Sequence, residues 1–252
     1  MKLGLIGAGN MASALARGLG EPVLVSDLEP ERAEALAGAV GGQALASNAE
    51  VADRADAVVL CHKPPGLEEV AAEIAGKARV VVSILAATPT ERIEAAYPGV
   101  PVYRFIPSLP AEVGRGVLCY VPGTRAAEGP ERELLELFAR AGTVMQMEDE
   151  TLIEPAMALM SCGPAFMAAV VEGFAEAGED HGLPRDETRR MAVETMAGTA
   201  AYLSAHDLDT EGLRARVATP GGVTEKGLVA LEEAGLRKAC RAAVDTVVEA
   251  TR

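Results

Sequence analysis

A glycine-rich turn near the start of the chain has the residue types and spacing of a phosphate-binding loop. Residues 7–12 read Gly-Ala-Gly-Asn-Met-Ala, after an apolar run and before a segment with helical periodicity. Gly7 permits the tight bend, Gly9 lets the backbone approach a pyrophosphate, and Ala12 permits close packing of helix on sheet. The amides at the start of the helix would hold the phosphates, although a bare turn is the alternative. The predicted phosphate-binding residues are Gly7, Ala8, Gly9, Asn10 and Met11.

An acidic residue, Asp27, lies 20 residues after Gly7, at the end of the second predicted strand. A carboxylate at this place accepts hydrogen bonds from the ribose hydroxyls of a bound adenosine and repels a 2′-phosphate. A helix cap is the alternative, since aspartate is also a common capping residue. Asp27 therefore favours NADH over NADPH, but only slightly, because Arg32 nearby could offset the repulsion.

A third polar stretch, Cys61-His62-Lys63-Pro64, follows another predicted strand. Ligands of open parallel sheets bind outside the carboxyl ends of the strands, so this loop is expected to face a cofactor. His62 is a candidate general acid. A histidine beside lysine and proline is more often a solvated loop residue, and the structural interpretation is the favoured one.

A second glycine turn, Thr219-Pro220-Gly221-Gly222-Val223-Thr224, opens a helix in the C-terminal part of the chain. Its exposed amides could form an anion-binding nest for a substrate carboxylate, with two hydroxyls beside it. An ordinary helix start, with Thr219 as the cap and Pro220 in the first turn, explains the same residues. The local sequence does not decide between the two interpretations.

Short apolar runs alternate with helical segments up to about residue 150. The predicted strands are 3–6, 22–26, 57–61, 79–84, 100–106, 116–121 and 143–147, and the predicted helices are 11–19, 31–37, 67–75, 90–96 and 127–141. This alternation predicts right-handed βαβ units and an α/β fold with a doubly wound sheet.

After residue 150 the strand pattern stops and only amphipathic helices follow. They are predicted over 157–178, 186–204, 209–217, 223–234 and 236–250, with a kink in the first at Gly163-Pro164. The chain is thus predicted to form a nucleotide-binding domain over 1–150 and an all-helical domain over 151–252. Alanine-rich helices without a β layer need a partner surface, so we expect an intertwined homodimer, and a higher assembly is compatible with the same faces.

Composition argues against several classes of protein. Lysine and arginine number 23 against 37 acidic residues, giving a formal charge of −14, and aromatic residues make up 3% of the chain. That field repels nucleic acid. The four cysteines are far apart and the three histidines lack metal-ligand spacing, so no disulfide framework or metal site is expected. The apolar run 80–87 is too short for a membrane span, and reduced thiols suit the cytoplasm.

The motifs taken together resemble those of pyrroline-5-carboxylate reductases, a family that reduces a cyclic imino acid to proline with a nicotinamide cofactor. The matching stretches are 6–12, 63–64, 83–84, 104–107, 162–166, 182–184, 219–224, 231–232 and 235, in the family's order and spacing over nearly the whole chain. The resemblance implies an N-terminal Rossmann domain and a helical dimerisation domain that interlocks with a partner subunit. The family's active site lies between the nucleotide domain of one subunit and the helical domain of the other.

The resemblance also implies roles for residues. Asn48 would approach the adenosine ribose, Cys61, His62, Lys63 and Pro64 would border the cofactor, and Thr219, Gly221, Gly222, Val223 and Thr224 would hold the substrate carboxylate. Thr224 falls at the family's proposed proton donor. The implied reaction is reduction of 1-pyrroline-5-carboxylate to L-proline, the last step of proline biosynthesis, by hydride transfer from NADPH or NADH to a C=N bond.

Some positions differ from the family pattern. This chain has Ser108, Cys162 and Val223 where the family usually has asparagine, serine and threonine, and His62 where it usually has valine. Polar contacts near the nicotinamide and the carboxylate are thus altered. Two alternatives stay open: a reductase of the same fold that acts on another small imine or keto acid, and a catalytically inert nucleotide-binding relative.

Overall fold

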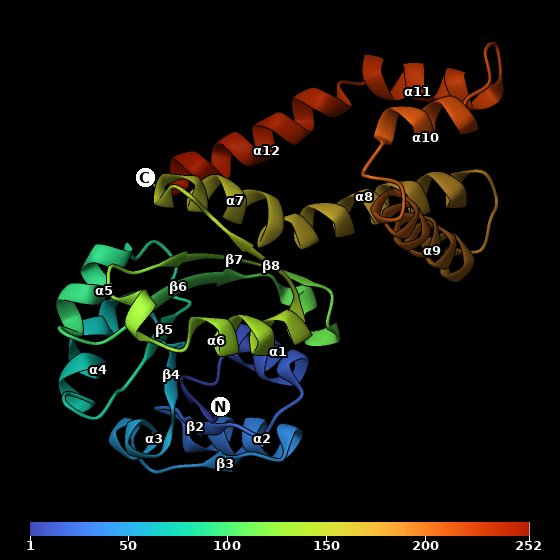
Figure 1. Ribbon diagram of the computed structural model, residues 1–252. Coiled ribbons are helices and arrows are strands. Elements are labelled where there is room, and N and C mark those ends of the chain that lie inside the picture. The colour runs from blue at the N-terminus through green and yellow to red at the C-terminus, as the bar shows by residue number, and fades with distance from the viewer. Residues whose placement is uncertain (252) are drawn as a thin grey trace. The chain divides into compact units, whose positions relative to one another are not determined.

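The computed structural model describes residues 1–251 and divides them into two compact units, Met1–Pro164 with Thr251, and Ala165–Ala250. The first unit is built on an eight-stranded sheet in the order β3-β2-β1-β4-β5-β6-β7-β8 (Figure 1). The strands are β1 (Leu3–Ile6), β2 (Leu24–Ser26), β3 (Gln43–Ala44), β4 (Ala57–Leu60), β5 (Val81–Ser83), β6 (Val102–Pro107), β7 (Gly116–Pro122) and β8 (Gly142–Gln146).

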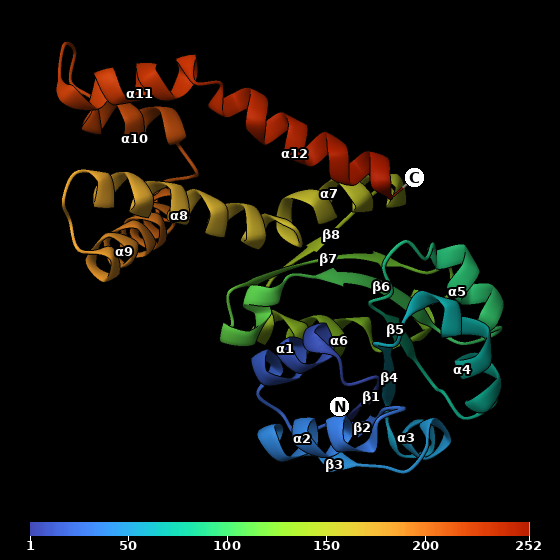
Figure 2. The ribbon, with the colours of Figure 1, turned by 180° about the vertical axis from the view of Figure 1, so that it is seen from behind.

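The central strands are short runs of aliphatic residues because helices cover both faces of the sheet. One face is covered by α1 (Asn10–Leu19), α2 (Pro30–Val40) and α6 (Glu131–Phe138), and the other by α3 (Asn48–Arg54), α4 (Leu67–Glu73) and α5 (Thr90–Ala96). Figure 2 shows the second group from behind. The sheet is parallel from β3 to β6, and β7 runs antiparallel to β6. The predicted doubly wound α/β fold is confirmed.

Helix α1 is held in place by the short helix η2 (Leu109–Val113), which follows β6. Gly18 of α1 lies so close to the carbonyl group of Ala111 that a β-carbon at position 18 would overlap the carbonyl oxygen. The two backbones therefore meet directly. This contact fixes the helix whose first turn follows the glycine-rich loop.

A buried ion-pair cluster anchors the end of the first unit. The Arg104 side chain on β6 is 1% exposed; its Nη1 lies 2.6 Å from Glu150 Oε1 and its Nη2 3.0 Å from Glu154 Oε1. The amide and hydroxyl of Thr90 donate to the same Glu150 oxygen, at 2.7 and 2.8 Å. Burial opposes ionisation of Glu150, but these hydrogen bonds and the guanidinium hold its pKa below the usual range. The cluster ties α7 (Ile153–Met160) to the sheet.

The second unit consists of helices with little core of their own. They are α8 (Gly163–Asp180), which begins at the end of the first unit, α9 (Arg185–Ser204), α10 (Thr210–Val217), α11 (Val223–Glu233) and α12 (Leu236–Ala250). Of the residues described between 165 and 250, Ala175 and Thr188 alone are buried. A folded unit of this size normally buries far more apolar surface.

The structure corrects three expectations about the elements. Residues 157–178 do not form one kinked helix, because α7 ends at Met160 and α8 begins at Gly163, where Pro164 fits the first turn without needing an amide partner. In the predicted helix 127–141, Pro130 separates η3 (Ala126–Glu128) from α6, and η4 (Ala139–Ala141) follows α6 directly. The short elements β3 and α3 were not expected.

Candidate functional site

The carboxyl ends of three parallel strands bring the predicted cofactor residues to one edge of the sheet. β2, β1 and β4 are neighbours in that order and run in the same direction. Asp27 follows β2, Gly7 follows β1 and Cys61 follows β4. In open parallel sheets this edge is where ligands bind.

The glycine-rich turn has the backbone geometry that the sequence predicts. Gly7 has φ +105° and donates its amide hydrogen to Ser26 O at 2.8 Å. A β-carbon on Gly7 would lie 2.8 Å from the Cys61 carbonyl, whereas one on Gly9 would meet nothing within 4 Å. No side chain in the described part of the molecule caps the N-terminus of α1. Free amides beside open space fit a pyrophosphate.

Asp27 contacts the same turn. Its Oδ2 accepts the Ala8 amide at 2.6 Å and its Oδ1 accepts the Glu29 amide at 2.9 Å. Arg32 is paired with Glu29 at 3.0 Å. The guanidinium that could have offset repulsion between Asp27 and a 2′-phosphate thus has an acidic partner, Glu29, at the exposed surface.

Asn48 lies at the same edge, in the first turn of α3. Its Oδ1 accepts the Ser26 hydroxyl at 2.6 Å, and its Nδ2 donates to Glu73 Oε2 at 2.5 Å. Ser26 precedes Asp27, so Asn48 lies beside the carboxylate predicted to bind the adenosine ribose.

The loop after β4 holds its residues in different environments. Burial raises the pKa of the Cys61 thiol, which makes it a poor nucleophile. The His62 ring is held by a 2.8 Å contact between Nδ1 and Lys63 O, and burial lowers the pKa of its imidazole. The Lys63 side chain is exposed, and Pro64 begins the short helix η1 (Pro64–Gly66).

The loop before α11, in the second unit, forms a tight turn. Gly221 has φ +74°, and the Gly222 amide donates to Thr219 O at 2.9 Å. The Gly221 amide donates to Glu225 Oε2 at 2.7 Å, so a carboxylate already lies on this loop. Glu225 was missed from the sequence. Its position three residues after the N-cap Gly222 is that of a capping-box glutamate, a signal that could have found it.

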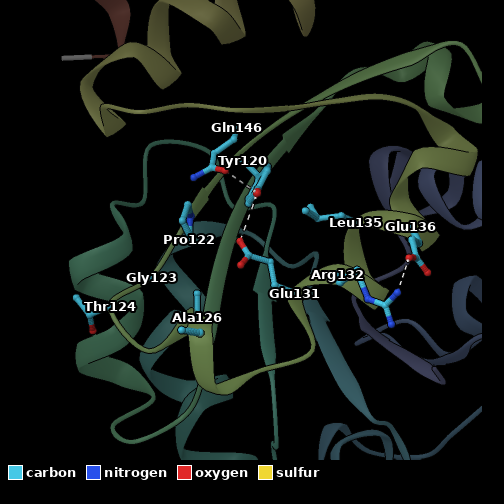
Figure 3. Close-up of a pocket in the computed structure, with 11 residues that line it drawn as sticks. Tyr120, Pro122, Gly123, Thr124, Ala126, Glu131, Arg132, Leu135, Glu136 and Gln146 are labelled. Atoms are coloured by element: carbon cyan, nitrogen blue, oxygen red, sulfur yellow. Dashed lines mark hydrogen bonds and ion pairs between the residues drawn. The ribbon is translucent and has the colours of Figure 1, made fainter.

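A groove of about 620 Å³ lies at the opposite edge of the sheet (Figure 3). It is near the start of β6, because Pro122 at the end of β7 pairs with Tyr103. The Tyr120 hydroxyl lies 3.3 Å from Glu131 Oε1 and 3.1 Å from Gln146 Oε1. Burial and the Glu131 charge raise the pKa of Tyr120 to about 12. These groups are paired with one another, so the groove is a weaker candidate site than the carboxyl edge.

Comparison with known proteins identifies both parts of the chain. Residues 150–252 match the family model described as pyrroline-5-carboxylate reductase dimerisation, and residues 2–87 match the model described as NADP oxidoreductase, coenzyme F420-dependent. Pyrroline-5-carboxylate reductase 3 of Macaca fascicularis is 32% identical over 257 residues, covering 97% of this chain and 92% of that relative. The chain belongs to the pyrroline-5-carboxylate reductase family. The resemblance seen in the sequence is confirmed.

Solved structures agree with this family. A pyrroline-5-carboxylate reductase from Coxiella burnetii matches with a TM-score of 0.89 at 25% identity, covering 99% of this chain and 97% of that one. The Plasmodium falciparum pyrroline carboxylate reductase with NADP bound, at 23% identity, has a TM-score of 0.88 and shows the same fold.

A second relative supports the family by sequence. The Synechocystis pyrroline-5-carboxylate reductase is 30% identical, covering 97% of this chain and 94% of its own length.

The positions that differ from the family pattern lie in distinct surroundings. Ser108 is buried and its Oγ accepts the Val117 amide at 2.9 Å, so it positions the start of β7. Cys162 lies between α7 and α8 and is half-buried. Val223 is 86% exposed at the start of α11. Within residues 1–251 no group of three or more His, Cys, Asp or Glu side chains is placed to hold a metal ion.

Proposed function

We propose that this chain reduces 1-pyrroline-5-carboxylate to L-proline. The observation that carries the proposal is the near full-length similarity to pyrroline-5-carboxylate reductases, together with the uncapped start of α1 after the glycine-rich turn. A bound reduced nicotinamide supplies the hydride. Amides at the start of α1 hold the pyrophosphate, and residues Cys61 to Pro64 border the nicotinamide half.

The loop before α11 is the proposed seat of the substrate carboxylate. The Gly221 amide would bind it as it now binds Glu225, and Glu225 would move aside when substrate arrives. The Gly222 amide would take part only by leaving its contact with Thr219 O. Thr219 and Val223 border this seat, and the Thr224 hydroxyl would donate toward the imine nitrogen. Positioning and electrostatics then provide most of the catalysis.

NADH is the proposed preferred cofactor. Asp27, with Glu29 and Glu31 nearby and Arg32 already paired, disfavours a 2′-phosphate. We expect initial rates with 1-pyrroline-5-carboxylate to favour NADH over NADPH by about tenfold in kcat/KM, a difference of about 1.4 kcal/mol. Asp27→Asn removes the charge together with one of the two amide contacts and should reduce this ratio several-fold, whereas Glu34→Gln, farther along α2, should leave it unchanged.

The same assay tests the reaction itself. Turnover of other small cyclic imines or keto acids, but not of 1-pyrroline-5-carboxylate at saturation, would identify a different reductase of this fold. Binding of NADH without any turnover would identify an inert relative. An NADPH preference in wild type would overturn the cofactor assignment alone.

Removing the Thr224 hydroxyl should slow turnover more than it weakens cofactor binding. Loss of one hydrogen bond to the reacting imine costs about 1.4 kcal/mol, so Thr224→Ala should lower kcat about tenfold with the NADH dissociation constant unchanged. Thr210→Ala, in the first turn of α10, is the matched control. Steady-state kinetics equal to wild type would remove Thr224 from the mechanism.

The helical unit is proposed to form a homodimer. Apolar side chains of α8, α9 and the loop between them, including Phe174, Met191 and Leu183, line a groove of about 550 Å³, and these three are 45–58% exposed. The segment Glu150–Asp180 is long and apolar enough to cross a membrane by length and composition, since an 18-residue window within it has a mean hydropathy of 1.5. Because this segment belongs to the part of the chain that matches a dimerisation model, we propose that a second copy of the chain packs against its apolar surface.

Sedimentation should therefore show a dimer or a larger homo-oligomer at micromolar concentration. Phe174→Glu should shift the population toward monomer, because a charge in the groove would oppose burial. A wild-type monomer under these conditions would contradict the proposal. The four unpaired thiols are compatible with the proposed cytoplasmic location.

A further inference from the structure

Three buried polar atoms have no hydrogen-bond partner in the described part of the chain: His62 Nε2, Tyr97 Oη and Arg104 Nε. Tyr97 belongs to the apolar core beneath α5, and the Arg104 guanidinium already makes two ion pairs. His62 differs, because it lies in the loop at the candidate cofactor edge. An unpaired polar atom at a ligand-binding edge indicates a missing partner.

The contact to Lys63 determines which His62 nitrogen carries the proton. A carbonyl oxygen only accepts, so Nδ1 must donate to Lys63 O at 2.8 Å. Burial lowers the pKa of the imidazole, and the Glu73 carboxylate on α4 acts in the opposite direction without reversing the shift. The ring is therefore neutral near pH 7, and its Nε2 has a lone pair that can accept a hydrogen bond.

The surroundings of His62 keep the ring in this orientation. A β-carbon on Gly66 would lie 3.4 Å from Nδ1, so glycine leaves room for the ring beside η1. The Nε2 atom itself is buried, whereas His62 as a whole is half-buried and Lys63 and Pro65 on the same loop are exposed. A small displacement of the loop would admit a donor.

The order of strands indicates which part of a dinucleotide lies here. Asp27 after β2 marks the adenosine ribose, and the uncapped start of α1 after β1 marks the pyrophosphate. A dinucleotide laid along this edge places its other half at the next strand, β4. His62 follows β4 by two residues.

We propose that His62 Nε2 accepts a hydrogen bond from a ribose hydroxyl of the nicotinamide half of the cofactor. The inference rests on the proposed function for the identity of the dinucleotide. His62 is thereby a binding residue specific to this chain, because the resembling family usually has valine at this position and valine has no acceptor.

Binding of cofactor fragments tests this assignment without any turnover. His62→Val should weaken binding of NADH and of nicotinamide mononucleotide about tenfold in calorimetry and leave binding of ADP-ribose unchanged. His206→Val is the matched control, because His206 Nδ1 makes the same 2.8 Å contact to a carbonyl, that of Tyr202, in the second unit. This control should bind all three ligands like wild type.

Nitrogen NMR of the histidine side chains gives an independent reading. In wild type the unprotonated Nε2 signal of His62 should move upfield on addition of nicotinamide mononucleotide, while the His206 signals stay in place. Unchanged fragment affinities in His62→Val, or an unmoved Nε2 signal at saturation, would overturn the assignment even if the enzyme reduces 1-pyrroline-5-carboxylate. An effect on fragment binding in a chain that does not reduce this imine would uphold the inference and reject the proposed substrate. Wild type that binds neither NADH nor either fragment would reject both.

Discussion

Gly7→Ala is expected to weaken NADH binding by about 100-fold or more, a loss of about 2.7 kcal/mol or greater. Gly7 has φ +105°, a conformation that L side chains rarely adopt. In addition, a β-carbon would lie 2.8 Å from both the carbonyl carbon and oxygen of Cys61. The new methyl group would push the ends of β1 and β4 apart, at the edge where the pyrophosphate is expected to lie. Titration by NADH fluorescence measures the effect.

Gly20→Ala separates backbone strain from the close contact. Gly20 ends α1 with φ +65°, but a β-carbon there would meet nothing within 4 Å. It should cost about 1 kcal/mol of stability and leave the NADH dissociation constant unchanged. Circular dichroism of Gly7→Ala should still show the folded spectrum. Wild-type affinity in that variant would refute the assigned role of the turn.

Arg104→Met is expected to lower the free energy of unfolding by about 3 kcal/mol. Methionine replaces the apolar part of the side chain but leaves Glu150 and Glu154 without the guanidinium that both contact. Removing one partner of a buried ion pair is costly because the other charge stays behind. Chemical denaturation at a fixed protein concentration measures the loss, since oligomerisation also contributes to stability.

Two further measurements distinguish the stability contributed by this buried cluster from that of an exposed ion pair. Arg92→Met removes an exposed pair with Glu68 and should cost less than about 1 kcal/mol. The folded pKa of Glu150 is lowered, so its ionisation stabilises the fold above the ordinary glutamate pKa, and this contribution is lost as the pH falls through the folded pKa. The difference in the free energy of unfolding between wild type and Arg104→Met should therefore become smaller as the pH falls. Equal losses for both arginine variants would contradict the role given to Arg104.

Elements with a clear apolar pattern and well-marked ends could be predicted closely. Strand β1 and helices α5 and α12 have the predicted bounds. The reversal of β7 could also have been predicted, because the segment 108–115 is too short for a crossover between parallel strands. The two residues of β3 show no periodicity. For α3 the capping pair Ser47 and Glu50, joined at 3.2 Å, was an available signal.

For the candidate site, the sequence indicates residue types but not the pairings among them. The position of Asp27 in the chain predicts a carboxylate at the edge of the sheet. Its contact with the Ala8 amide depends on the exact separation of β1 and β2, which no local pattern specifies. The unpaired Nε2 of His62 is likewise visible only once neighbouring atoms are placed.

The direct contact between Gly18 and Ala111 limits how this enzyme can be redesigned. Because the two backbones touch, α1 and η2 behave as one block, and a side chain at position 18 would displace a helix that begins at the phosphate turn. A library aimed at altered cofactor use can vary the exposed residues after Asp27, whereas Asp27 itself holds the Ala8 and Glu29 amides. The library should keep position 18 as glycine. Although this position lies two turns of helix from the phosphate turn, the spacing between the Gly18 and Ala111 backbones leaves no room for a side chain.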